Sequence, residues 1–97
     1  MKHVFIINPK AGKDKRALSL IPEINRYFAE NPGDYVINIT NAPMDATRLT
    51  RSHADKGGEV RFYACGGDGT LFEVLNGAYG RNNVEIACIP CGSANDY

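Results

Sequence analysis

The sequence predicts an α/β fold, a three-layer structure in which a parallel sheet of about four strands carries helices on its faces. The first observation behind this prediction is that short β-rich runs alternate with longer segments of helical apolar spacing along the whole chain. The second is that the helical segments are long enough to be crossovers, which join parallel strands with right-handed connections. The third is size, because 97 residues with 43% hydrophobic content suit one domain with a modest core.

Four β-rich runs predict the strands, at residues 3–8, 35–40, 60–65 and 84–89. The first run is apolar almost throughout and stops at Asn8-Pro9, as expected of a strand that is buried on both faces. The third run leads directly into Gly66-Gly67, so a strand is followed at once by a glycine-rich turn.

Apolar residues recur at helical spacing between these strands, in residues 14–30, 43–56 and 70–80. Pro22 leaves two alternatives for the first segment: a helix kinked at that proline, or a regular helix from Ser19 with Pro22 in its first turn.

The third helix is expected to begin at Thr70. Thr70 would be the N-cap residue and Glu73 would complete a capping box. Gly77 and Gly80 are expected to weaken this helix and to end it.

Composition and the N-terminus narrow the class of protein. Eleven Lys and Arg balance eleven Asp and Glu, so no net charge attracts nucleic acid or anionic lipid. The apolar runs are too short for a transmembrane helix, and residues 1–9 lack the features of a signal peptide. Three cysteines in such a chain suggest reduced thiols, and we expect a cytoplasmic protein.

Two of these cysteines, Cys88 and Cys91, have C-x-x-C spacing, which leaves a thiol redox site as an alternative to inert thiols. Inert thiols are favoured, because Cys88 falls within a strand that is expected to be buried. The other Cys and His residues match no zinc spacing, so no metal ligands are predicted.

The unusual loops all follow strands, at residues 8–12, 40–41, 66–70 and 90–96. In a parallel sheet the carboxyl ends of the strands lie at one edge, where α/β proteins bind their ligands. The four loops are therefore expected to converge on one site.

The segment Gly66-Gly67-Asp68-Gly69-Thr70 carries the strongest chemical signal. Three glycines allow positive φ and close approach of a ligand, and the amides at the following helix N-terminus favour an anion such as phosphate. A carboxylate beside a phosphate is unfavourable unless a metal lies between them or the carboxylate handles a proton, so Asp68 is a candidate for either role. A plain glycine-rich turn is the alternative.

Two further segments are weaker signals when taken singly. Residues 8–13 offer two lysines and a glycine between a strand and a helix, but they do not form a P-loop. Residues 90–96 offer small, hydroxyl and amide groups that suit either a nucleotide or a turn.

Together these segments resemble the diacylglycerol kinase catalytic domain family, which includes bacterial diacylglycerol kinases, sphingosine kinases and ceramide kinases. The resemblance rests on three motifs: residues 8–12; residues 66–70 with Glu73-Val74 and Asn76-Gly77; and Pro90, Gly92 and Asn95-Asp96. NAD kinases and phosphofructokinases share the Gly-Gly-Asp-Gly-Thr element, so the first and last motifs single out the lipid kinases.

The resemblance implies the nucleotide-binding part of an enzyme that transfers the γ-phosphoryl group of ATP to a lipid hydroxyl such as that of diacylglycerol, with ATP and Mg²⁺ as cofactors. It implies a catalytic or magnesium-nucleotide role for Asp68. The implied nucleotide-binding residues are Asn8, Pro9, Lys10, Ala11, Gly12, Thr40, Gly66, Gly67, Asp68, Gly69, Thr70, Leu71, Phe72, Gly92, Ser93, Asn95 and Asp96. Phe72 stands where the family commonly has Asn, and Ser93 where it usually has Thr.

Family members continue into a β-rich second domain that completes the lipid site, whereas this sequence ends at Tyr97. The resemblance therefore implies that residues 1–97 correspond to the N-terminal part alone, with little or no kinase activity in isolation. An intact enzyme of this kind would contact the inner face of the membrane peripherally. The alternatives are a fragment of an NAD kinase-like enzyme and a non-catalytic nucleotide-binding module.

Overall fold

The computed structural model describes residues 1–91, with the backbone alone for residues 13–15. The elements in chain order are β1 (Lys2–Ile7), η1 (Lys13–Ser19, a 3₁₀ helix), α1 (Leu20–Glu30), β2 (Asp34–Ile39), α2 (Asp45–Ala54), β3 (Val60–Gly66), α3 (Asp68–Ala78) and β4 (Val84–Pro90). The four strands form one parallel sheet in the order β2-β1-β3-β4. The predicted fold class is confirmed.

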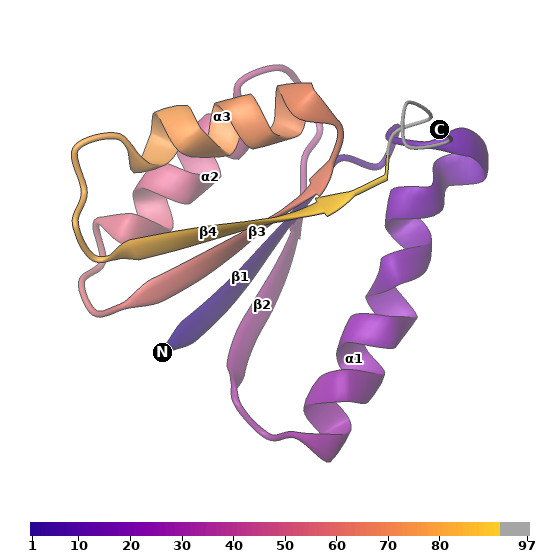
Figure 1. The fold of residues 1–97 in the computed structure, drawn as a ribbon, viewed down its shortest axis with the longest axis horizontal. Coiled ribbons are helices and arrows are strands. Elements are labelled where there is room, and N and C mark those ends of the chain that lie inside the picture. The colour runs from indigo at the N-terminus through magenta and orange to yellow at the C-terminus, as the bar shows by residue number, and fades with distance from the viewer. Residues whose placement is uncertain (92–97) are drawn as a thin grey trace.

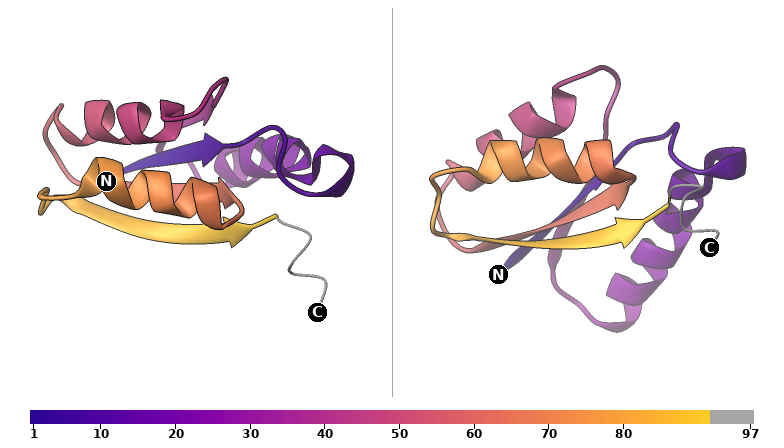
Figure 2. Two further views of the ribbon diagram at one scale, coloured as in Figure 1. Left: turned by 90° about the horizontal axis from the view of Figure 1, so that it is seen from above. Right: turned by 45° about the horizontal axis from the view of Figure 1, so that its top comes forward.

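The helices cover both faces of the sheet. Figures 1 and 2 show α2 and α3 together on one face and α1 on the other. The central strand β1 serves both halves of the core: Val4 and Ile6 pack under α2 and α3, and Phe5 and Ile7 pack under α1. This two-sided burial explains why the first strand is apolar almost throughout.

The helical segment before β2 adopts the second of the two predicted alternatives, a regular helix with Pro22 in its first turn. The 3₁₀ helix η1 precedes α1, and α1 begins at Leu20, so Pro22 lies in the first helical turn. Proline is tolerated there because its missing N–H would have no intrahelical partner.

The predicted capping box on α3 is wrong. The helix begins at Asp68, two residues earlier than expected, with Gly67 as the N-cap residue and no side-chain capping hydrogen bond. Thr70 is buried inside the first turn, against Gly66 of β3. Tertiary packing of this threonine overrides the local capping pattern.

None of the helices in the described part of the chain is long and apolar enough to cross a membrane.

Both histidines lie at partly buried positions. Nδ1 of His3 is 2.8 Å from the Tyr63 hydroxyl, and Nε2 of His53 is 2.9 Å from Oδ1 of Asn38. Burial is the main reason why the pKa of each imidazole lies below its ordinary value of 6.5. The folded state therefore binds protons less readily than the unfolded state does.

We expect the free energy of unfolding to be greatest above pH 6.5 and to decrease as the pH falls from there toward the lowered pKa values of His3 and His53. Urea unfolding at pH 7.5, 6.5 and 5.5 measures this dependence. The variant His53→Gln, which cannot titrate, should show a weaker dependence. Stability that stays constant or increases on acidification over this range would contradict the expectation.

Candidate functional site

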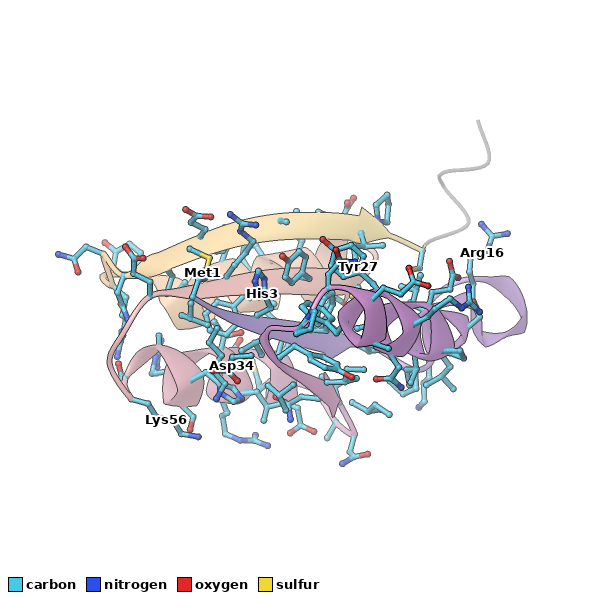
Figure 3. The ribbon with its side chains drawn as sticks, turned by 90° about the horizontal axis from the view of Figure 1, so that it is seen from below. Met1, His3, Arg16, Tyr27, Asp34 and Lys56 are labelled. Carbon is cyan, nitrogen blue, oxygen red and sulfur yellow. The ribbon has the colours of Figure 1, made fainter. Side chains whose placement is uncertain are left out.

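The side of β1 on which the chain adds its next strands changes after β2. From β1 the chain passes through α1 to β2 on one side, whereas β3 and β4 lie on the other side of β1. Ligands of open α/β sheets bind at such a switch point, outside the carboxyl ends of the strands. In Figure 3, Met1, Asp34 and Lys56 mark the end where the strands begin, and Arg16 marks the end where they finish.

The strand register brings the loops together. Ile7 pairs with both Ile39 and Cys65, and Cys65 pairs with Ile89, so all four strands end in one row. Backbone hydrogen bonds continue past the row: Asn8 N donates to Cys65 O at 3.1 Å, and Cys91 N donates to Gly66 O at 3.0 Å. The predicted convergence is confirmed for the described loops.

A cleft of about 740 Å³ opens at this edge, a size that suits a small-molecule ligand. Nine of the predicted residues line it: Asn8, Pro9, Lys10, Ala11, Gly12, Thr40, Gly67, Gly69 and Thr70. Five residues that the sequence did not assign to nucleotide binding also line it: Asn41, Ala42, Pro43, Ala46 and Glu73.

Four of the predicted residues are placed by the structure but are not among those lining the cleft. Gly66 is buried at the end of β3, and Leu71 packs against the core under α3. Asp68 and Phe72 are exposed in the first turns of α3. Gly92, Ser93, Asn95 and Asp96 lie outside the described residues, so their assignment stays a prediction.

The loop after β1 forms one wall of the cleft as a tight turn. Oδ1 of Asn8 accepts a hydrogen bond from Lys10 N at 3.0 Å, and Asn8 O accepts one from Ala11 N at 3.1 Å. This Asx-type turn leads to Gly12, whose φ of 80° is accessible mainly to glycine. A Cβ on Gly12 would lie 2.1 Å from the carbonyl oxygen of Cys91, so the turn lies directly against the end of β4.

The glycines after β3 act differently from what the sequence suggested. Positive φ was expected among them, yet Gly12, Gly57, Gly58 and Gly80 are the glycines with positive φ in the described chain. Gly66 is needed for packing instead, because a Cβ there would lie 2.4 Å from Oγ1 of Thr70.

Gly67 and Gly69 leave space at the second wall of the cleft. A Cβ built on either residue meets no atom within 4 Å. Both lie at the start of α3, where the first backbone N–H groups have no intrahelical acceptor and the helix dipole favours negative charge. This wall can therefore bind an anion through its backbone. The carboxylate of Asp68 is also favourable at a helix N-terminus, whatever its chemical role.

The loop after β2 is the third wall. The sequence placed residues 40–41 at the site and assigned only Thr40 to nucleotide binding. Thr40 N donates to Ile7 O at 2.9 Å, which fixes the start of the loop to β1. Asp45 follows the loop and is buried. Its Oδ2 accepts hydrogen bonds from Asn41 N at 2.7 Å and Ala42 N at 3.0 Å.

The sequence did hold a signal for Asp45, an acidic residue at the end of a short loop before a helix. The backbone N–H of Asn41 is the largest cause of a lowered pKa for the Asp45 carboxyl, and Arg48 adds to the effect. Asp45 is therefore ionised at neutral pH and accepts charge-assisted hydrogen bonds.

The donor set of the described residues limits how a cation could be held. No group of three His, Cys, Asp or Glu side chains lies together in that part of the chain. Two carboxylates lie on α3 on this side of the molecule: Glu73 lines the cleft, and Asp68 stands exposed in the first turn. Mg²⁺ needs few protein ligands when phosphate oxygens supply the others, so these residues fit a cation that arrives with a nucleotide.

All three cysteines are free thiols, and two of them are buried. Burial raises the pKa of the Cys65 thiol to about 12 and also raises the pKa of Cys91. Cys88 is exposed, contrary to the expectation of a buried position, because β4 is an edge strand.

A second cleft, of about 580 Å³, lies between α1 and the sheet at the end where the strands begin. Its lining includes His3, Tyr27, Gly33 and Arg61, of which Figure 3 labels the first two. None of the candidate motifs at residues 8–12 and 66–70 lines this second cleft.

The doubly wound sheet, with a cleft at its switch point, is the architecture in which α/β proteins commonly bind ligands at the carboxyl edge. Sequence comparison is more specific. The chain belongs to the diacylglycerol kinase catalytic domain family, which it matches over residues 2–97.

Individual relatives agree with this assignment. A diacylglycerol kinase of Staphylococcus epidermidis is 37% identical over 104 residues, which cover 96% of this chain and 29% of that protein. Sphingosine kinase B of Dictyostelium discoideum is 31% identical over 98 residues, which cover 94% of this chain and 12% of that protein. The chain thus spans less than a third of the length of these relatives.

A solved structure supports the fold as well as the family. The crystal structure of a diacylglycerol kinase from Bacillus anthracis superimposes with a TM-score of 0.70 at 33% sequence identity. The match covers 99% of this chain and 35% of that one.

Proposed function

We propose that residues 1–97 form the nucleotide-binding part of a lipid kinase that transfers the γ-phosphoryl group of Mg·ATP to a lipid hydroxyl such as that of diacylglycerol. The observation that carries the proposal is the cleft at the switch point. There the N-terminus of α3 and two glycines without neighbours at their Cβ positions face an open space of about 740 Å³. Membership of the kinase family favours a lipid over NAD as the acceptor.

The phosphates would bind at the start of α3. Backbone N–H groups there have no acceptor within the helix, and Gly67 and Gly69 let phosphate oxygens approach them closely. Lys10 on the facing loop adds positive charge to the same cleft. Phosphoryl transfer depends mainly on positioning and charge stabilisation, and this arrangement supplies both for the donor.

Asp68 is the proposed catalytic residue. It stands in the first turn of α3, next to the glycines that would contact the phosphates. A carboxylate there can accept the proton of the attacking hydroxyl or hold the nucleotide-bound Mg²⁺, and the latter supplies charge neutralisation on the phosphates. Gly92, Ser93, Asn95 and Asp96 are proposed to complete the nucleotide site, with Asn8 to Gly12 and Thr40.

The lipid site is proposed to lie in the β-rich C-terminal domain of a longer protein, at the membrane surface. The 97-residue chain should then phosphorylate neither diacylglycerol nor sphingosine, since half a cleft can neither exclude water nor orient the acceptor. Transfer of radiolabelled phosphate from ATP to lipid in mixed micelles measures this. Appreciable turnover by the isolated chain would contradict the proposal that the lipid site lies in a C-terminal domain.

The variant Gly69→Ala separates nucleotide binding from stability. A methyl group at residue 69 meets no protein atom, but it enters the space beside the α3 N-terminus. We expect Mg·ATP affinity to fall at least about tenfold, because displaced phosphate oxygens lose charge-assisted hydrogen bonds. The melting temperature should stay constant or increase, since Ala favours a helix over Gly by about 1 kcal/mol.

Gly33→Ala is the matched control, because Gly33 also lacks positive φ and lies at the second cleft. Isothermal titration calorimetry should give it wild-type affinity. If Gly33→Ala weakened binding and Gly69→Ala did not, the nucleotide would bind at the second cleft and the proposal would fail.

A further inference from the structure

The loop between β2 and α2, residues 40–44, brings no charged side chain to the cleft. Thr40 and Asn41 line the cleft at the start of this loop, and Ala42 and Pro43 follow them. Such a mixture of small polar and apolar groups suits an uncharged part of an organic ligand, such as a nucleoside, better than it suits phosphate. If the phosphates bind at α3, this wall remains for the base and ribose.

The conformation of this loop is not one that its residues prefer. Met44 has a φ of 73°, in the left-handed region that non-glycine residues rarely adopt. Its side chain is exposed, so no packing of that side chain compensates for the strained backbone. Something else must hold the loop in place.

The carboxylate of Asp45 is the group that does so. Asp45 is buried directly behind the loop. Its Oδ2 accepts hydrogen bonds from the backbone N–H groups of Asn41 and Ala42, and its Oδ1 accepts one from the Arg48 guanidinium. Two successive loop amides are thereby tied to the start of α2. The helix is itself held to α3 by the Thr47 hydroxyl, which donates to Glu73 O at 2.9 Å.

We propose that Asp45 is a positioning residue, which holds the wall formed by residues 40–43 against the nucleoside part of a bound nucleotide. The inference rests on the proposed function, because it assumes that the cleft binds a nucleotide with its phosphates at α3. It assigns to Asp45 no contact with the ligand.

The test compares two ligands on the 97-residue chain. Mg·ATP reports on the phosphate and nucleoside subsites together, whereas magnesium tripolyphosphate reports on the phosphate subsite alone. Asp45→Ala should weaken Mg·ATP binding about tenfold, because a loop released from Asp45 would hold the binding conformation in only about a tenth of the molecules. It should change tripolyphosphate binding by less than about twofold, since the α3 N-terminus is untouched.

Two further variants separate positioning from a general loss of structure. Asp45→Asn keeps one acceptor oxygen and should give an intermediate affinity for Mg·ATP. Asp55→Asn also removes an arginine-paired carboxylate next to α2, where Asp55 accepts Arg81 Nε at 3.0 Å, but Asp55 does not line the cleft. It should bind both ligands as the wild type does.

The possible results of this test distinguish the proposed function from the proposed role of Asp45. A wild-type chain that binds neither ligand would overturn the proposed function and this inference with it. A wild-type chain that binds both ligands equally well, or an Asp45→Ala variant that weakens both equally, would overturn the inference and leave the phosphate site standing. Selective loss of Mg·ATP binding in Asp45→Ala supports it.

Discussion

Replacing Gly12 by alanine should lower the free energy of unfolding by about 4 kcal/mol, as the sum of backbone strain and overpacking. Gly12 combines a φ of 80° with a ψ of 165°, a conformation that is almost restricted to glycine. The added methyl group would lie 2.1 Å from Cys91 O and 2.9 Å from the Cβ of Arg16. The carbonyl cannot move away easily, because Cys91 is buried and bonded through its N–H to Gly66.

Gly58→Ala is the matched control for this variant. Gly58 also has a φ of 80°, but a Cβ there meets no atom within 4 Å. Its cost should be that of the backbone conformation alone, about 1 kcal/mol. Urea unfolding of both variants measures the difference. Equal losses would mean that the loop after β1 does not lie against the end of β4.

Gly77→Ala should lower the free energy of unfolding by about 2 kcal/mol, a typical cost of overpacking after the gain in helix propensity is subtracted. A Cβ on Gly77 would lie 2.5 Å from Thr47 O and 2.7 Å from the Cβ of Thr50, so α3 would have to move away from α2. That movement would also stretch the bond from Arg51 to Asn76 O, now 3.1 Å.

The control lies in the same helix. Gly69→Ala adds the same methyl group to α3 where nothing obstructs it, and it should not destabilise the protein. Thermal unfolding of the pair isolates the contact between α2 and α3. A Gly77→Ala variant as stable as Gly69→Ala would contradict the close approach of the two helices.

The succession of strands and helices along the chain and the parallel direction of the strands could be predicted because the sequence signals are local and strong. The apolar run from Val4 to Ile7 reports burial on both faces, and each crossover has the periodicity of a helix. The convergence of the loops then follows from the topology alone. The motifs at residues 8–12 and 66–70 could therefore be placed on one edge without a structure.

What the sequence missed depends on contacts between distant residues. Thr70 satisfies a capping pattern in the sequence, but in the structure it is buried against Gly66. Gly77 was expected only to weaken the helix, whereas it lies where α3 packs closely against Thr47 of α2. Nothing near Gly12 in the sequence indicates the carbonyl of Cys91. The hydrogen bonds from Asn41 and Ala42 to Asp45 were overlooked because the helix was expected to begin at residue 43, which placed Asp45 inside it.

The central claim is that the loops at the carboxyl edge form one nucleotide site. Titration of Mg·ATP into the isotope-labelled chain, followed through the backbone amide resonances, tests it most directly. We expect saturable shifts at Gly12, Gly67 and Gly69, with Ala42 shifting at the same concentrations and Gly33 at the second cleft unchanged. A folded sample whose resonances stay fixed at millimolar Mg·ATP, or whose shifts gather around Gly33, would contradict the claim.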